Sequence, residues 1–435
     1  LWKLLQQLNL ELSEDYARKL FRIDLIQAAD TKRRDQMLDE DEFVIFFERL
    51  TERRDLRQIL RTYSSAHQET FTPTDLMHFL VQQQHFEEID DNKARDIVQT
   101  FERAKRDEQQ PLLLGPLGFR HLLRAQYGNI FKPGHETVFQ DMDCPLNYYY
   151  VNSSHNTYLT GLQLAGMASI EGYINALTKG ARLLELDIFD GDDGEPCITH
   201  KHTLVDAIRL RDALTTIEQY AFKYSPYPVI LTIENHVGLV QQKVMFRIFN
   251  EVFGDKIYIS PPNSATSELP SPNALKNKFL VRGKKLPHEV VNSQSSDDDS
   301  AKQVKLDPEF SRLISLPSAK ITNNADNDMR THPMDGSPSL SESKVESIFQ
   351  SSYNLPAYTA RRFVKSYPSG FRQNSSNMDP FPSWLLGVQS VALNMQTADK
   401  FLDLNTAMFR VNGNCGYVLK PDILRRGLGR LSLFH

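Results

Sequence analysis

Hydrophobic and polar positions follow two different patterns along the chain, and the change falls near Pro133. From Leu1 to about Tyr127, charged residues are interleaved with apolar residues at helical spacing and glycines are few, which predicts an all-α region. After Pro133, short apolar runs are separated by stretches long enough for helices. Strands that alternate with helices predict an α/β parallel sheet, either open or closed into a barrel.

Two segments of the helical region have the helix, acidic loop, helix rhythm of an EF-hand: residues 21–50 and, equally degraded, residues 86–123. A calcium-binding loop of this kind needs oxygen ligands at alternate positions, a central glycine and a terminal Glu. In the first segment Lys32, Arg33 and Arg34 occupy the middle of the loop, and no glycine is present. We therefore expect structural EF-like pairs without bound calcium.

A third pattern interrupts the α/β region. From about Pro287 to Ser341 the chain is rich in Ser, Asn and Asp, and it contains the acidic run from Asp297 to Asp299. Such low-complexity polar composition predicts a linker or insertion without a packed core of its own. Strand-like runs return after it, so we expect the linker to divide one α/β body into two parts.

Composition and charge narrow the class of protein. The chain has 435 residues, of which 40% are hydrophobic and 24% charged, as in ordinary globular proteins. A net charge of −5 gives no general basic surface for nucleic acid. Three scattered cysteines form neither a disulfide framework nor a zinc motif, which indicates a reducing compartment. Because no apolar run reaches about 18 residues, we expect a soluble protein whose membrane contact is peripheral.

The apolar run at residues 182–190 carries two acidic residues, Glu185 and Asp187. Side chains two apart on a strand point to the same face, so this pair of like charges needs a cation, a proton or a ligand. Asn156 and Glu234 end two other strand-like runs, and ligands gather at the carboxyl ends of parallel strands. Three carboxylates and one amide suit a hard cation such as calcium or magnesium.

Two histidines, His155 and His200, follow strand-like runs and remain as acid and base groups near neutral pH. A metal together with two histidines indicates phosphoryl-transfer chemistry. Each feature alone has a commoner explanation, because a Glu-x-Asp pair is usually a salt-bridged strand end and a single histidine is usually structural. The order of all of them along the chain carries the interpretation.

Six longer motifs occur in one order: NSSHNTYLTG, ELDIFDGDDGEP, YPVILTIENH, LPSPNALKNKFLVRGKKLP, SYPSGFRQNSSNMDP and VALNMQTADKFLDLNTAMFRVNGNCGYVLKPDILR. Together they resemble the X and Y halves of a eukaryotic phosphoinositide-specific phospholipase C with a delta- or zeta-like layout, from roughly Phe131 to Arg425. The resemblance implies a TIM-like barrel preceded by a degenerate EF-hand-like domain. Its parts would be the EF-hand-like domain at 1–130, the X half at 131–286, the acidic linker at 287–341 and the Y half at 342–435.

The resemblance also implies an activity. Members of this family hydrolyse phosphatidylinositol 4,5-bisphosphate, with calcium, to diacylglycerol and inositol 1,4,5-trisphosphate through a cyclic phosphodiester. The expected partner is therefore this lipid, reached by peripheral contact of a cytoplasmic protein with the inner face of the plasma membrane. No nucleic-acid partner is expected, and the sequence does not identify a protein activator. The chain begins with Leu1, and we expect it to be a fragment that lacks the family's pleckstrin-homology and C2 domains.

Catalytic roles follow from the same motif match. The implied Ca²⁺ ligands are Asn156, Glu185, Asp187 and Glu234. His155 would stabilise charge on the phosphoryl oxygens, and His200 would protonate the leaving diacylglycerol oxygen and then act as a base toward water. The base for the first step is either Glu185 or Glu234.

Substrate contacts are implied in both halves of the barrel. The implied headgroup contacts are Arg282, Lys284, Ser352, Lys365 and Tyr367. Lys365 stands where the family usually has arginine, which keeps the charge but loses the bidentate fork. The segment after Ser352 is shorter than in the family, so we expect most of one barrel helix to be absent. A hydrophobic ridge beside the pocket mouth is implied at Leu164, Leu204 and Phe371.

Two other functions fit parts of the sequence. One is a catalytically inactive scaffold that binds phosphoinositides or proteins, and the other is a metal-free lyase of the bacterial type that stops at the cyclic product. The presence of both histidines and all three carboxylates favours an enzyme over the scaffold. The carboxylate set and the divided barrel argue against the lyase.

Overall fold

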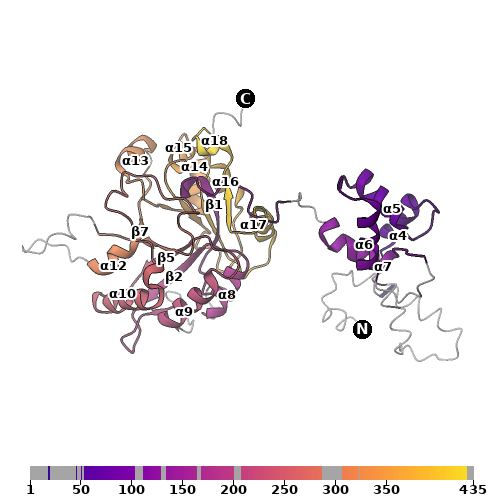
Figure 1. The fold of residues 1–435 in the computed structure, drawn as a ribbon. Coiled ribbons are helices and arrows are strands. Elements are labelled where there is room, and N and C mark those ends of the chain that lie inside the picture. The colour runs from indigo at the N-terminus through magenta and orange to yellow at the C-terminus, as the bar shows by residue number, and fades with distance from the viewer. Residues whose placement is uncertain are drawn as a thin grey trace, which may run out of the picture. The chain divides into compact units, whose positions relative to one another are not determined.

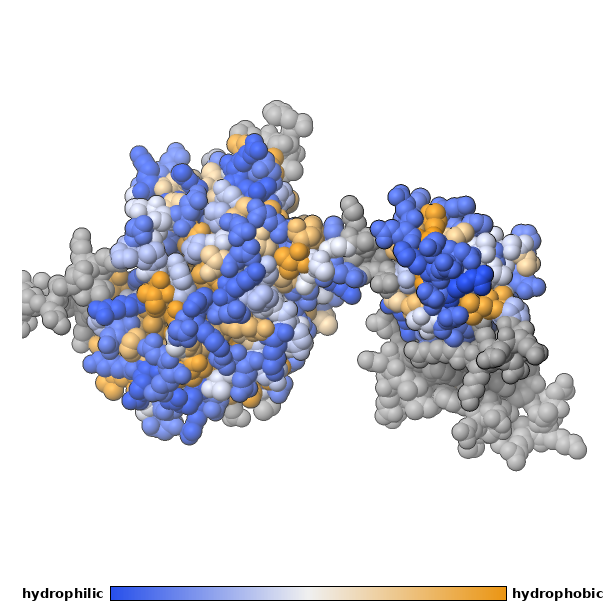
Figure 2. All heavy atoms as spheres, in the orientation of Figure 1, coloured by the Kyte–Doolittle hydropathy of each residue, from blue (hydrophilic) through white to orange (hydrophobic). Residues whose placement is uncertain are grey.

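The computed structural model describes residues 18–19, 46, 50, 53–102, 111–128, 134–163, 168–199, 207–286, 306–322 and 324–428. The chain divides into two compact units, Leu1–Ile130 and Phe131–His435 (Figure 1). Hydrophilic and hydrophobic residues are interspersed over the described surface that Figure 2 shows. No helix in these ranges is long and apolar enough to span a bilayer.

The first unit is helical where it is described. Its α-helices are α4 (Arg54–Tyr63), α5 (Pro73–His78), α6 (Asp91–Phe101) and α7 (Pro116–Arg124). Paired backbone hydrogen bonds between Phe71 and Leu114, of 3.0 and 2.8 Å, join the loops that precede α5 and α7. Phe71 and Phe119 pack edge to face inside the unit. The predicted helix pair at 86–123 thus corresponds to α6 and α7, whereas most of the pair predicted at 21–50 lies outside the described residues.

The second unit is a barrel of parallel strands. Its eight parallel strands are β1 (Tyr149–Ser154), β2 (Leu183–Phe189), β5 (Val229–Asn235), β6 (Phe279–Gly283), β7 (Ile314–Pro317), β8 (Ser339–Ser341), β9 (Lys365–Tyr367) and β10 (Ser390–Leu393). Each pairs with its neighbour in chain order, except β7 with β8, and β10 pairs with β1. Between β7 and β8 the backbone N–H of Ser337 donates to the carbonyl of Pro317 at 2.7 Å. This order is that of a TIM-like barrel with a seam, which confirms the predicted fold.

Helices and short antiparallel strands complete the second unit. The helices are α8 (Ile170–Thr178), α9 (Leu210–Ala221), α10 (Leu239–Phe253), α12 (Pro308–Leu313), α13 (Ala325–Thr331), α14 (Glu342–Gln350), α15 (Leu355–Thr359), α16 (Phe381–Leu385), α17 (Lys400–Arg410) and α18 (Asp422–Arg425). The antiparallel strands are β3 (Cys197–Ile198), β4 (Ile208–Arg209) and β11 (Tyr417–Leu419). The helices surround the parallel strands in Figure 1.

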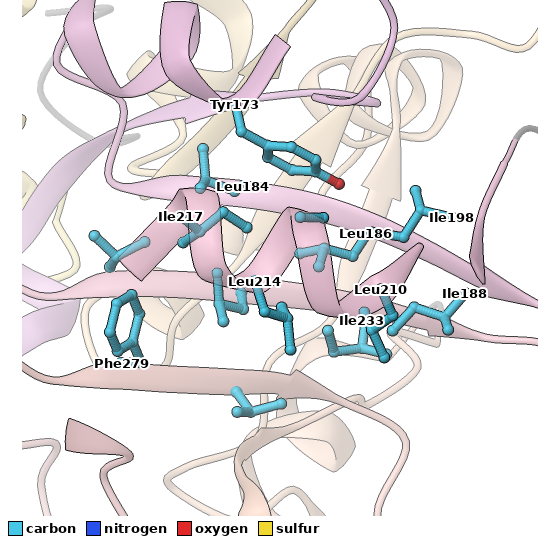
Figure 3. Close-up of a cluster of buried hydrophobic side chains, with 14 of the residues drawn as sticks. Tyr173, Leu184, Leu186, Ile188, Ile198, Leu210, Leu214, Ile217, Ile233 and Phe279 are labelled. Carbon is cyan, nitrogen blue, oxygen red and sulfur yellow. The ribbon is translucent and has the colours of Figure 1, made fainter. Parts of the chain in front are cut away.

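The side chains of β2 alternate between two environments. Leu184, Leu186 and Ile188 are fully buried in a cluster with α8 and α9, which Figure 3 shows. Glu185 and Asp187, which lie between them in the sequence, must therefore point to the opposite face of the strand, into the barrel. Apolar packing on the outer face thus fixes the direction of two acidic side chains on the inner face.

Two predictions for the centre of the chain are wrong. Residues 306–341, assigned to the linker, carry α12, β7, α13 and β8. The run Ile314–Pro317 is buried except for its last residue and pairs with β6, although polar residues surround it in the sequence. The helix expected to be mostly absent is present, because α14 and α15 lie between β8 and β9. Residues 287–305, with the acidic run, lie outside the described residues.

Candidate active site

A cavity of about 670 Å³ opens at the carboxyl ends of the parallel strands. Every parallel strand, or the loop that follows it, contributes a lining residue. In chain order these include His155, Glu185, Glu234, Arg282, Ser318, Ser339, Lys365 and Asn394. The cavity therefore lies at the end of the barrel where TIM-barrel enzymes carry their active sites.

Two of the three acidic side chains in this cavity are buried. Asp187 lies opposite Glu234 in the parallel register of β2 and β5. Burial raises the pKa of Asp187 well above its usual value, and the charges of Glu185 and Glu234 raise it further. Its Oδ2 accepts a hydrogen bond of 2.6 Å from the hydroxyl of Tyr158. Its Oδ1 is buried and has no hydrogen-bond partner among the described residues, which marks a place for a proton or a cation.

Asn156 adds an amide beside these carboxylates. Its backbone has a φ of +39°, a left-handed conformation that asparagine tolerates better than most residues. Its backbone N–H donates to Oε2 of Glu185 at 3.0 Å, and its Nδ2 donates to Oε1 of Gln163 at 2.8 Å. Because Nδ2 is used by Gln163, Oδ1 is the side-chain atom that remains to face a cation.

The residues present fit a hard cation by their chemistry. Asn156, Glu185, Asp187 and Glu234 supply only oxygen donors, and the unpartnered Oδ1 of Asp187 lies among them. Within the described ranges, no group of three or more His, Cys, Asp or Glu side chains is arranged so that it could hold a metal ion. In the present arrangement Glu185 is paired with a lysine, and the side chain of Glu234 is 54% exposed.

His155 is held between an amide and a carboxylate. Its Nδ1–H donates to Oδ1 of Asn394 at 3.1 Å, and its Nε2 lies 4.0 Å from Oε2 of Glu185. Burial lowers the pKa of His155, although the charge of Glu185 acts in the opposite direction. The imidazole lies parallel to the ring of Tyr367, with 6.4 Å between the ring centroids. Nε2 is therefore the ring nitrogen that faces the carboxylates.

Basic side chains also line the cavity. Arg282 is buried and donates three hydrogen bonds of 2.7 Å, two to Ser337, which precedes β8, and one to Oγ of Ser339 on β8. Burial lowers the pKa of Arg282 to about 10, while Glu185 and Glu234 act against this shift. Lys284 is exposed at the rim.

Lys365 forms a buried ion pair with Glu185. The distance from Nζ of Lys365 to Oε1 of Glu185 is 2.5 Å, and both side chains are at most 3% exposed. Burial is the largest single influence on the pKa of Glu185 and raises it, but the charges of Lys365 and His155 and the hydrogen bonds from Lys365 and Asn156 together lower it to about 2. The ammonium group of Lys365 also lies 5.3 Å from the ring centroid of Tyr367.

One predicted contact is misplaced. Ser352 is exposed in the segment after α14 and is not among the residues that line the cavity. Ser339, on β8, lines the cavity instead and accepts from Arg282. The prediction is wrong because the polar composition around β8 is typical of a linker and gives no sign that Ser339 lies on a strand.

The remaining predicted residues divide into two groups. His200, Leu164 and Leu204 lie outside the described residues. Phe371 is 95% exposed on the loop that follows β9, between residues that line the cavity. Leu162, on the loop that follows β1, was not predicted and is 53% exposed.

Sequence reasoning also missed several polar residues of the cavity. Asn394 directly follows β10, so the rule that polar residues at strand ends form sites would have found it. His236 follows β5, and its Nε2 lies 3.6 Å from Oε2 of Glu234. Gln163 lies in a loop with no periodic signal, and no pattern would have indicated it.

Family models match three successive parts of the chain. They are phosphoinositide-specific phospholipase C, EF-hand-like, at residues 46–133, and the X and Y domains of phosphatidylinositol-specific phospholipase C at 142–285 and 310–423. The X and Y matches together cover more than half of the chain. The Y match begins before β7, in agreement with the folded state of that segment.

Individual proteins are similar over nearly the whole chain. The chain is 36% identical to 1-phosphatidylinositol 4,5-bisphosphate phosphodiesterase delta-1 of Rattus norvegicus, over 97% of this chain and 58% of the relative. It is also 36% identical to inactive phospholipase C-like protein 1 of Mus musculus, over 97% and 40%. The crystal structure of S. officinalis PLC21 matches with a TM-score of 0.70 and 29% identity, over 96% and 57%. The chain thus spans less than two thirds of each of these proteins.

Proposed function

The chain belongs to the phosphoinositide-specific phospholipase C family, and on this basis we propose that it hydrolyses phosphatidylinositol 4,5-bisphosphate in a calcium-dependent reaction. The products are diacylglycerol and inositol 1,4,5-trisphosphate, formed through a cyclic phosphodiester. One observation carries the proposal: a single cavity collects carboxylates, histidines, basic side chains and neutral polar side chains from the eight parallel strands and the loops that follow them.

The basic side chains account for binding of the phosphorylated headgroup. Arg282 and Lys284 on one side and Lys365 on the other offer positive charge to the ring phosphates. Tyr367 is half-buried beside His155 and offers a ring face against which the inositol ring packs. Lys365 can bind a phosphate only if its ion pair with Glu185 is broken. Because Glu185 is also a proposed ligand of the cation, we expect binding of the cation and binding of the lipid to be coupled.

The reaction follows from the positions of the acidic and basic groups. Calcium held by Asn156, Glu185, Asp187 and Glu234 would lower the pKa of the inositol 2-hydroxyl and neutralise phosphoryl charge. Either Glu185 or Glu234 takes the proton of this hydroxyl, which attacks phosphorus within the same molecule. The phosphate favours protonation of His155, whose Nε2–H then donates to a phosphoryl oxygen. His200 protonates the departing diacylglycerol oxygen and then removes a proton from the water that opens the cyclic product.

The lipid nature of the substrate agrees with the rim of the cavity. Phe371 and Leu162 expose apolar side chains on the loops that follow β9 and β1, at the same end of the barrel as the cavity. We infer that these loops touch the membrane while the headgroup enters the cavity and the acyl chains stay in the bilayer. The contact is peripheral, and its place is the cytoplasmic face of the plasma membrane.

The alternative is a phosphoinositide-binding scaffold without catalysis. One observation favours it: the buried ammonium group of Lys365 already neutralises Glu185, which reduces the need for a metal. The similarity to a relative named as inactive is in line with this reading. The two functions share headgroup binding and differ in turnover.

The deciding experiment measures inositol trisphosphate released from mixed micelles that contain phosphatidylinositol 4,5-bisphosphate, with calcium or with a chelator. We expect calcium-dependent release that falls by about 10² or more in His155→Ala. His78→Ala is the matched control, because this histidine is exposed in the other unit and should leave release unchanged. Headgroup binding without release from the folded chain would establish the scaffold instead.

A further inference from the structure

Gln163 makes a complete set of side-chain hydrogen bonds close to the proposed catalytic groups. Only 9% of the residue is exposed. Its Oε1 accepts from Nδ2 of Asn156 at 2.8 Å, and its Nε2 donates to Oγ of Ser375 at 2.9 Å and to Oδ1 of Asn394 at 3.2 Å. Both amide protons and the amide oxygen are therefore used, which fixes the orientation of this side chain.

The partners of Gln163 set the orientation of two groups that the proposed reaction uses. Because Nε2 of Gln163 donates to Oδ1 of Asn394, this oxygen is an acceptor, and it also accepts Nδ1–H of His155. Nε2 of His155 is thereby left to face Glu185. Because Oε1 of Gln163 accepts from Nδ2 of Asn156, the Oδ1 of Asn156 is turned toward the cation. One amide thus controls which atom each of these groups presents to the substrate and the metal.

Gln163 also joins two loops that lie far apart in the sequence. Its backbone N–H donates to the carbonyl of Gln373 at 3.2 Å. The hydroxyl of Ser375 donates to the carbonyl of Gly161 at 2.9 Å. Ser375 has a φ of +57°, a conformation that a serine keeps only when its surroundings hold it there. The loop after β1 and the loop after β9 are therefore fastened together at the position of Gln163.

The same two loops carry exposed apolar residues. Leu162 directly precedes Gln163 and is 53% exposed, and Phe371 lies two residues before Gln373 and is 95% exposed. A surface that holds both side chains also holds the two backbone segments that Gln163 connects. The exposed side chains of Leu162 and Phe371 therefore lie on the same two loops that the hydrogen bonds of Gln163 hold together.

We propose that Gln163 is a positioning residue that couples contact of Leu162 and Phe371 with a lipid surface to the orientation of His155 and Asn156. The inference rests on the proposed function and deepens it. A lipid surface that keeps the two loops together favours the state in which every bond of Gln163 is formed. Loss of these bonds frees His155 and Asn156 to rotate, so catalysis and metal binding weaken even where substrate binding does not.

The test compares the wild type with Gln163→Met, which keeps the length of the side chain but none of its hydrogen bonds. With a water-soluble, short-chain phosphatidylinositol 4,5-bisphosphate, we expect kcat to fall by about tenfold or more while KM changes little. Calorimetry should show calcium binding weakened by a similar factor, since Asn156 loses its orienting partner. Sedimentation with vesicles should show membrane binding that is only modestly weaker, because Leu162 and Phe371 are still present although the side chain of residue 163 no longer fastens their loops together.

A second pair of variants tests the coupling itself. In the wild-type background, Leu162→Ser with Phe371→Ser should lower the rate on vesicles per bound enzyme while the rate on the soluble lipid is kept. In the Gln163→Met background, the same two changes should have no further effect on the rate per bound enzyme, because the connection is already lost. Independent, additive effects would overturn the coupling.

Two further outcomes are distinct. An active wild type together with an unchanged kcat and calcium affinity in Gln163→Met would overturn the role of Gln163 and leave the proposed function intact. A wild type that turns over neither lipid would reject the proposed function, and the positioning role would fall with it. If Gln163→Met does not fold, Ser375→Ala removes the hydroxyl that accepts from Gln163 and donates to Gly161, and it should shift kcat and calcium affinity in the same direction, by a smaller factor.

Discussion

At the scale of single residues, the positive charge of Lys365 is expected to be needed for stability. Its ammonium group and the carboxylate of Glu185 are both buried and have 2.5 Å between them. A buried pair gives little net stability compared with apolar residues of the same size, but loss of one partner leaves an uncompensated charge. The two partners come from β9 and β2, so their pairing also joins the two halves of the barrel.

Lys365→Met is therefore expected to lower the free energy of unfolding by about 3–5 kcal/mol in the presence of a chelator. Calcium should recover part of this loss in the variant, because a cation bound by Glu185 replaces the missing charge. The measurement is urea unfolding with and without calcium, and Lys365→Arg is the control that keeps the charge. Equal stability of the Met variant and the wild type in chelator would contradict the ion pair.

Lys420 gives a second prediction, on the dependence of stability on pH. Burial, with a smaller contribution from Arg425, lowers the pKa of Lys420 to about 7, and its Nζ donates to the carbonyls of Thr359 and Gly387. In the unfolded chain the pKa of lysine is about 10.4. Between these two values the unfolded chain holds a proton that the folded chain lacks, so the free energy of unfolding rises with pH.

The check on Lys420 is urea unfolding at a series of pH values from about 7 to 9.5, for the wild type and Lys420→Met. The wild type should gain stability relative to the variant as the pH rises through this window. The difference between the two proteins removes the contribution of all other titrating groups. A constant difference would mean that Lys420 stays protonated in the folded protein.

At the scale of elements, β2 shows how a strand serves the core and the site together. Its apolar residues pack against α9, and Leu214 of that helix is fully buried in the same cluster (Figure 3). Leu214→Ala should cost about 2–5 kcal/mol of unfolding free energy, through lost burial and the cavity it leaves. Leu404→Ala on α17, where the leucine is 38% exposed, should change stability by less than about 0.5 kcal/mol.

Thermal unfolding of the two alanine variants provides the comparison. Lipid hydrolysis per folded molecule at low temperature should stay near the wild-type value in both, because neither leucine lines the cavity. A large loss of hydrolysis in a folded Leu214→Ala protein would mean that packing of α9 controls the directions of Glu185 and Asp187.

Sequence reasoning succeeded where local pattern and tertiary role coincide. The alternation along β2 was enough to predict that Glu185 and Asp187 share a face, because the period of a strand does not depend on the rest of the fold. It failed for β7 and β8, which are four and three residues long within polar surroundings. Such strands form because the barrel supplies their partners, and this information is not local.

The candidate site shows the same limit. Residues at the ends of clearly patterned strands, such as Asn156 and Glu234, line the cavity, and their role as metal ligands stays a prediction. Ser339 was missed together with its strand. Gln163 was missed because its role depends on Ser375 and Asn394, which are more than 200 residues away in the sequence. The pairing of Lys365 with Glu185, 180 residues apart, was likewise not visible in the sequence.

At the scale of the whole molecule, the site exists only when the barrel is closed. The bond between His155 and Asn394 joins residues that are 239 positions apart, and it depends on the pairing of β1 with β10. The pairing of β6 with β7 makes the other junction between the two halves. The X half supplies the acidic side chains and both halves supply basic and polar groups, so neither half contains a complete cavity.

The two junctions predict how the molecule behaves when the chain is cut between β6 and β7. The halves should still assemble when produced together, because β1 and β10 pair in four register positions and β6 and β7 in three. Lipid hydrolysis should return on mixing and be absent from either half alone. Activity of one isolated half would show that the cavity does not need both.

The seam between β7 and β8, crossed by the hydrogen bond from Ser337 to Pro317, lies within the second piece of such a cut protein, so it does not help to hold the two pieces together. The rejoined pieces are held by the pairing of β6 with β7 and by the pairing of β1 with β10 and β11. Joining them is then a second-order process, and the tethering that one continuous chain provides is lost. The proposed hydrolysis by the cut protein should be lost on dilution and recover on concentration, so its rate would report how much of each half is present.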